Sequence, residues 1–215
     1  MEEYRVIRSA RKTLSLEITE DLTVLVRAPY QVSQSRIDAF VERQQDWITA
    51  HRAACDLVDR MYGVPVKEKT PLVIASAGGF PKDLNFYQTI KTLSNALEVV
   101  EEDGTIILVT QSQEGFGNSD TQRQIAGFST MVEREKDLRE NFSIGAFIGY
   151  LFAESAEKYH MIVVTGMEQS DFGSAKIHVV KTLDQALALS RELNGGKDLR
   201  ATLMPHGANT LPKFA

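Results

Sequence analysis

The chain contains LVIASAGGFPKDLNFYQTIK over residues 72–91, and this stretch decides the predicted fold. Its first four residues are apolar and partly β-branched, which is typical of a strand buried on both faces of a parallel sheet. Gly78 and Gly79 let the backbone turn sharply and approach a ligand closely. Asp83 or Asn85 can cap the following helix, whose free N–H groups and positive dipole end favour a carboxylate or a phosphate. The stretch therefore predicts an anion site, although a lone Gly-Gly pair also fits an ordinary strand-to-helix turn.

The helix after this turn has one apolar stripe, formed by Phe86, Ile90, Leu93 and Leu97. That stripe must face the sheet. At about 100° per residue, Gln88 and Lys91 fall on the opposite side, three positions apart and therefore as neighbours. An amide and an ammonium group near a helix start suit an oxygen-rich ligand that approaches from outside the domain. A solvated polar face is the alternative interpretation of the same spacing.

The composition is typical of a folded protein in a reducing compartment. Of the 215 residues, 43% are hydrophobic, which is ample for a packed core. The 29 acidic and 24 basic residues give a net charge of −5, so we expect neither nucleic acid nor an anionic membrane as a partner. The single cysteine, Cys55, excludes an intramolecular disulfide, and no stretch reaches the roughly 18 apolar residues of a membrane span. We therefore expect a cytoplasmic location, without a secretory signal.

Residues 1–52 predict a small antiparallel β-β-β-α unit. Apolar and polar residues alternate over 14–18 and 22–26 around a tight connection, as in an antiparallel hairpin, and a strand before them completes the sheet. Ser33 is expected to cap the helix that follows. Residues 53–69 are predicted to form a connector.

Strand and helix patterns alternate over residues 70–215, which predicts an α/β domain with a Rossmann-like parallel sheet and flanking helices. The expected elements are strand 71–76, helix 84–100, strand 104–110, helical region 119–158, strand 160–166, strand 176–181, helix 182–194 and strand 199–204. Loops with glycine follow four of these strands, at Gly78, Gly115, Gly166 and Gly207. Such loops would leave the carboxyl edge of one sheet, where open α/β folds bind ligands.

The sequence has no recognisable catalytic or metal-binding motif. Its four histidines, His51, His160, His178 and His206, lie far apart, and no His-Glu-x-x-His segment occurs. A Gly-x-Ser-x-Gly elbow, a Walker loop and a complete dinucleotide fingerprint are also missing. Glu114 and His206 are the loop residues best suited to ligand contact or acid-base work, although each also fits a solvated loop residue. We therefore assign no catalytic residue and no metal ligand.

Five short motifs follow one another along the second part of the chain: SAGGFPKD over 76–83, YQTIK over 87–91, GTIIL over 104–108, EGFG over 114–117 and MPHGANTLP over 204–212. In this order they resemble the C-terminal domain of nickel-dependent lactate racemases, over roughly residues 57–213. In that family the Gln and Lys of the Tyr-Gln-x-x-Lys segment contact the substrate carboxylate at a cleft between two domains. The resemblance implies this role for Gln88 and Lys91. The full predicted substrate-binding set is Gln88, Lys91, Gly78, Gly79, Tyr87, Glu114 and His206.

Residues 4–52 resemble a different family. RSARKTLSL over 8–16 and DWI over 46–48 are similar to the start of YgjP-like zinc metallopeptidases, whose His-Glu-x-x-His helix is missing here. Racemases of the first family carry a larger N-terminal domain that holds a nickel pincer cofactor on a lysine, and that domain is missing as well. The chain therefore resembles two partial domains joined together, with no cofactor of its own.

Two hypotheses for function follow from these resemblances. In the first, the chain is a catalytically incomplete module that binds a small carboxylate, a 2-hydroxy acid or a protein partner, and the isolated chain is not an enzyme. In the second, it is a subunit of a split 2-hydroxy-acid racemase, and a separate chain supplies the nickel cofactor. Because a partial domain leaves an apolar face or a sheet edge to cover, a homodimer is a further hypothesis.

Overall fold

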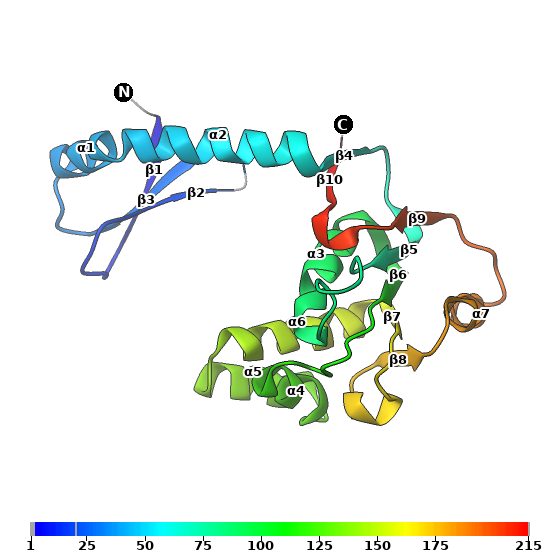
Figure 1. Ribbon diagram of the computed structural model, residues 1–215. Coiled ribbons are helices and arrows are strands. Elements are labelled where there is room, and N and C mark those ends of the chain that lie inside the picture. Colours follow the sequence, from blue (N-terminus) through cyan, green and yellow to red (C-terminus); the bar gives the residue numbers. More distant parts are fainter. Residues whose placement is uncertain (1–2, 20, 215) are drawn as a thin grey trace. The chain divides into compact units, whose positions relative to one another are not determined.

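A computed structural model of the chain describes residues 3–19 and 21–214 (Figure 1). The chain divides into two compact units, Met1–Tyr62 and Gly63–Ala215. Among the described helices, none is both long and apolar enough to cross a membrane.

The first unit packs a three-stranded sheet against two helices. Its elements are β1 (Tyr4–Ser9), β2 (Ser15–Ile18), β3 (Val24–Pro29), α1 (Gln34–Arg43) and α2 (Gln45–Tyr62). Alternate residues of β3 and the inner faces of the two helices form its core, which consists of Val24, Val26, Ala28, Ile37, Val41 and Ile48. Ser33 caps α1 as predicted, because its side chain accepts a hydrogen bond from the backbone N–H of Arg36.

The hairpin prediction is confirmed, since β2 and β3 pair in antiparallel fashion. The sheet as a whole is mixed rather than antiparallel, because β1 lies on the other side of β3 and runs parallel to it, with Tyr4 opposite Val24. The chain crosses from β1 to the far edge of the sheet before the hairpin brings β3 back through the centre. Alternation within single strands could not reveal this order of strands.

The segment 53–69, predicted to be a connector, is mostly regular structure. Its first part continues α2 as far as Tyr62, and β4 (Gly63–Val66) follows directly. Residues 53–62 contain Ala, Leu, Met and Arg, which favour helix, and this segment has neither glycine nor proline. The helix therefore has no local signal to end earlier.

The second unit is built on a five-stranded sheet in the order β8-β7-β6-β5-β9, with all neighbouring strands parallel. These strands are β5 (Thr70–Ser76), β6 (Val100–Val109), β7 (His160–Val164), β8 (Ile177–Val180) and β9 (Ala201–Met204). A separate parallel pair joins β4 to β10 (Leu211–Phe214). The predicted Rossmann-like parallel sheet is confirmed.

Helices cover both faces of this sheet (Figure 1). They are α3 (Ile90–Val99), α4 (Ser119–Ala126), α5 (Met131–Glu140), α6 (Ile144–Lys158) and α7 (Leu183–Leu193), with short 3-10 turns η1 (Phe86–Thr89), η2 (Gln169–Phe172) and η3 (Gly207–Asn209). The larger core lies on the side of α3 and α6, where Phe86, Leu93, Phe152 and Phe172 are fully buried. On the other side, Ala186 of α7 packs with Leu72, Ile107 and Ile162 of the strands.

Two predicted helical segments differ in detail. The helix expected over 84–100 begins as the 3-10 turn η1 and becomes α3 only at Ile90. The region expected over 119–158 divides into three helices, because Asn118, Thr130 and Ser143 each cap a new start with a side-chain oxygen.

Candidate functional site

The loops with glycine converge on one edge of the sheet, as the sequence predicts. Since β5, β6, β7 and β9 are all parallel, the loops after them leave the same carboxyl edge. The loops after β6 and β7 are joined directly, because Gly166 N–H and the Thr165 hydroxyl both donate to the carbonyl of Gln111. This edge is where open α/β sheets place their ligands.

A second set of hydrogen bonds joins the start of η1 to the loop after β6. We call residues 83–87 and 111–116 together the loop clamp. Its bonds are Gln111 N to Asp83 Oδ2 (2.9 Å), Ser112 N to Asp83 O (3.0 Å), Glu114 N to Leu84 O (3.0 Å), Phe86 N to Gly115 O (2.9 Å) and Tyr87 N to Phe116 O (3.2 Å). The rings of Phe86 and Phe116 pack edge to face behind these bonds, 5.8 Å apart. The clamp fixes the backbone that carries the candidate ligand-binding side chains.

The loop clamp corrects one sequence expectation, that of free N–H groups at the helix start. The N–H groups of Phe86 and Tyr87 donate to the clamp, and that of Gln88 donates to the carbonyl and side-chain oxygen of Asn85. Of the two predicted caps, Asn85 is the one observed, while the Asp83 carboxylate is buried in the clamp. The first three N–H donors of the helix are therefore occupied and are not available to an anion.

Gln88 and Lys91 lie next to each other and point away from the core, as their spacing predicts. Lys91 Nζ donates to Gln88 Oε1 over 2.8 Å, and Lys91 is exposed while Gln88 is half-buried. The predicted inward stripe is also observed, with Phe86 and Leu93 fully buried. Among the described residues, no carboxylate forms an ion pair with Lys91. Because Oε1 faces the ammonium group, the pair presents mainly N–H donors to solvent.

The glycine turn before η1 adds a second ammonium group, which the sequence interpretation missed. Gly78 and Gly79 both have positive φ, +97° and +74°. A Cβ built on Gly78 would lie 3.4 Å from Lys82 Cδ, so the lysine stem lies over the turn. Tyr87 is half-buried and packs against the larger core. Lys82 follows the predicted turn closely in the sequence, but the neighbouring residues do not indicate on which side of the turn its side chain lies.

Glu114 and His206 lie on loops at the same edge, and both side chains are exposed. Glu114 takes part in the loop clamp through its backbone, and the His206 carbonyl accepts from Asn209 N and Thr210 Oγ1. No interaction among the described residues joins either side chain to Gln88 or Lys91. The structure therefore brings Gln88 and Lys91 together. Glu114 and His206 lie at the same edge, and we assign no role to either side chain.

The family resemblance implies that a different domain holds the nickel pincer cofactor, and it assigns no ligand for that cofactor to the described residues. They contain no group of three or more His, Cys, Asp or Glu side chains arranged to hold a metal ion. Within the second unit, His160 and His178 lie at the starts of β7 and β8, and His206 lies at the opposite, carboxyl edge of the sheet. We assign no cofactor-dependent step to residues of this chain.

Curated relatives of this chain are lactate racemases. That of Lactiplantibacillus plantarum is 27% identical over 180 residues, which cover 78% of this chain and 40% of that protein. That of Thermoanaerobacterium thermosaccharolyticum is 26% identical over 117 residues, 54% of this chain and 25% of that protein. The chain thus spans at most about two fifths of the length of these two relatives.

Solved structures support the same fold. The lactate racemase apoprotein from Thermoanaerobacterium thermosaccharolyticum has a TM-score of 0.68 at 21% identity, over 76% of this chain and 40% of that one. A protein from Thermotoga maritima has a TM-score of 0.53 at 12% identity, over 78% of this chain and 42% of that one. At these identities the likeness concerns the fold alone.

Two family models match the chain. One, described as YgjP-like, metallopeptidase domain, matches residues 12–73, so the N-terminal resemblance is confirmed. The other, described as lactate racemase C-terminal domain, matches residues 66–211, which is most of the chain and includes every predicted site residue. The chain therefore belongs to the lactate racemase C-terminal domain family.

Proposed function

We propose that the α/β unit binds a small carboxylate, a 2-hydroxy acid such as lactate, through Gln88 and Lys91. The observation that carries this proposal is the hydrogen bond from Lys91 Nζ to Gln88 Oε1, which orients both groups at an exposed edge of the sheet. One ammonium N–H is used in that bond, so the remaining N–H groups of Lys91 and the Gln88 amide are available as donors. A carboxylate accepts at both oxygens and matches this set of donors.

Within this proposal the role of the unit is to bind and orient the acid. Lys91 supplies the charge that attracts the carboxylate, and the Gln88 amide donates to the second carboxylate oxygen or to the 2-hydroxyl group. The loop clamp keeps the backbone of both residues in place, so little conformational freedom is lost on binding. Among the described residues, no hydrogen bond or ion pair at this edge orients a basic side chain toward Gln88 or Lys91.

Turnover of a 2-hydroxy acid forms a second proposal, because racemisation must remove hydrogen from the α-carbon and return it to the other face. The Gln88–Lys91 pair offers hydrogen-bond donors and a positive charge, and neither takes up that hydrogen. We infer that any racemisation depends on a separate cofactor-bearing chain or domain that closes over this edge. Mixing the chain with such a partner should then give interconversion of D- and L-lactate that neither component catalyses alone.

Ligand binding is expected to be weak and to depend strongly on Lys91. Two charge-assisted hydrogen bonds on an open surface correspond to a Kd of about 1–10 mM for lactate. Replacing Lys91 with methionine leaves an unbranched side chain one atom shorter and removes the charge, so binding should weaken about tenfold or more. Chemical-shift changes of the ¹⁵N-labelled full chain during titration with sodium L-lactate measure both values.

Lys197→Met is the matched control, because Lys197 is also exposed but lies in the loop before β9. This variant should bind lactate like the parent chain. Absence of saturable shifts near Gln88 in the parent, or an equal response of both lysine variants, would contradict the proposed function.

A further inference from the structure

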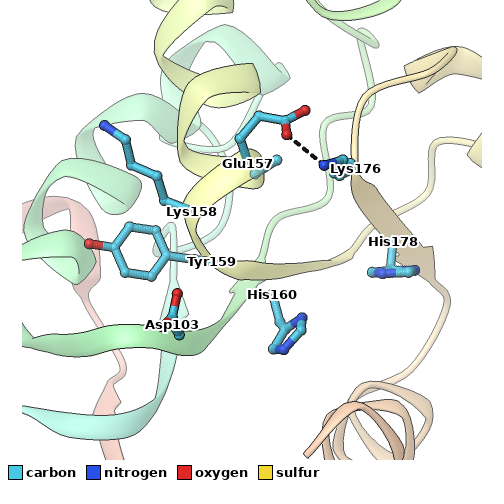
Figure 2. Close-up of a pocket in the computed structure, with 8 residues that line it drawn as sticks. Asp103, Glu157, Lys158, Tyr159, His160, Lys176 and His178 are labelled. Carbon is cyan, nitrogen blue, oxygen red and sulfur yellow. Dashed lines mark hydrogen bonds and ion pairs between the residues drawn. The ribbon is translucent and has the colours of Figure 1, made fainter. Parts of the chain in front are cut away.

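A recess lies at the amino edge of the sheet, opposite the edge that carries Gln88 and Lys91. It is a half-open hollow of about 390 Å³ at the starts of β7 and β8 (Figure 2). Its walls are Asp103, Ala156, Glu157, Lys158, Tyr159, His160, Lys176 and His178. The proposed carboxylate site uses none of these residues, so the hollow is distinct from that site.

The two histidines of the hollow share one face of the sheet. In the register of β7 and β8, Met161 lies opposite Ile177 and Ile162 lies opposite His178. Residues two apart on a strand point to the same face, so His160 and His178 are diagonal neighbours on the face that α7 covers. Figure 2 shows both rings beside the starts of these strands. Two long side chains at diagonal positions on adjacent strands are close enough to reach one another.

Both imidazole rings retain their ligand capacity. Both residues are half-buried, and within residues 3–19 and 21–214 neither ring makes a hydrogen bond or an ion pair. The Asp103 carboxylate, which lines the same hollow, also lacks a described partner. A neutral imidazole has one free nitrogen lone pair, which is the group that borderline divalent metals prefer.

The electrostatics of the hollow do not oppose a cation. The two ammonium groups on its wall are already paired, Lys176 with Glu157 at 2.6 Å and Lys158 with Glu154 at 3.5 Å. Because both ammonium groups are paired, the Asp103 carboxylate leaves the wall of the hollow with an unbalanced negative charge. Thr105, which lies opposite His160, accepts a hydrogen bond from Asn194 at the end of α7, so the negative end of that helix dipole is close.

We propose that His160 and His178 together bind a borderline divalent cation, Zn²⁺ or Cu²⁺, at this hollow. The described residues contain no group of three protein ligands, so the site has two imidazole ligands, and water completes the coordination. Such a site is exchangeable rather than structural, because it lacks the four protein ligands of a closed zinc site. It is independent of lactate binding at the opposite edge.

Titration of the ¹⁵N-labelled full chain with ZnCl₂ tests the proposal. Zinc should shift the backbone amides at the starts of β7 and β8 in a saturable manner. Replacing His160 or His178 with glutamine keeps a polar side chain of similar size and removes the imidazole. Each variant should weaken zinc binding about tenfold or more, since even the loss of an outer-shell partner costs about tenfold.

Histidines elsewhere in the chain provide the controls. His206→Gln should leave the zinc response of β7 and β8 unchanged. His51→Gln tests another pair of possible metal ligands, since His51 Nδ1 lies 3.5 Å from Cys55 Sγ on α2, and this variant should also leave that response unchanged. The proposal is overturned if the parent shows no saturable zinc shifts in β7 and β8, or if these shifts persist in both His160→Gln and His178→Gln.

Discussion

Gly117→Ala is expected to destabilise the α/β unit by about 2–3 kcal/mol and to weaken lactate binding. Gly117 has φ of +68°, a conformation that costs an L-residue about 1–2 kcal/mol. In addition, a Cβ at this position would overlap the side chain of Asn85. Asn85 must then move, and its cap on the Gln88 N–H is lost, which costs about 1 kcal/mol more. The change therefore disturbs the turn that carries Gln88.

Gly195→Ala separates backbone strain from the loss of space. Gly195 has nearly the same φ, +67°, but a Cβ there would meet no atom within 4 Å. Only the strain of about 1–2 kcal/mol should remain, and lactate binding should not change. Native-state hydrogen exchange of the buried β6 amides measures the free energy of unfolding of this unit alone. Equal losses in the two variants would show that contact with Asn85 contributes nothing.

The sequence predicts those features of the site that depend on nearby residues. Helical periodicity over a few turns is enough to place Gln88 and Lys91 on the outward face, and the structure places them there. Strand and helix alternation is enough to predict the parallel sheet and the edge at which its loops gather. Each of these predictions follows from spacing within one element or from the order of elements along the chain.

The features that the sequence did not reveal depend on residues far apart in the chain. The donors at the start of η1 look free in the sequence, but Gly115 and Phe116 accept from them across 29 positions. Strand register likewise brings His160 and His178 to one hollow, although 17 residues separate them in the sequence. The parallel place of β1 beside β3 depends on a crossover that local alternation does not encode.

Arg134 is a further example, because an arginine in the polar segment MVEREKDLRE suggests a solvated side chain. Instead it is only 2% exposed, and its Nε and Nη2 donate to the carbonyls of Gln124 and Ile125 over 2.8 and 2.9 Å. These carbonyls belong to the last turn of α4, which has no intrahelical donor for them. Burial lowers the pKa of the Arg134 guanidinium, but an arginine side chain stays protonated in proteins. The positive charge therefore caps the negative end of the α4 dipole.

Arg134→Met is expected to destabilise the α/β unit by about 3–5 kcal/mol. Two hydrogen bonds to a charged donor, worth about 1.5–3 kcal/mol each, are lost, and two buried carbonyls remain without partners. Arg134→Lys keeps the charge with a single donor group and should lose less. Arg139→Met is the matched control on the same helix, since Arg139 is exposed and its ion pair with Glu135 contributes about 1 kcal/mol or less. Hydrogen exchange of the β6 amides ranks the three variants, and a loss in Arg134→Met no larger than that in Arg139→Met would contradict the capping role of this buried charge.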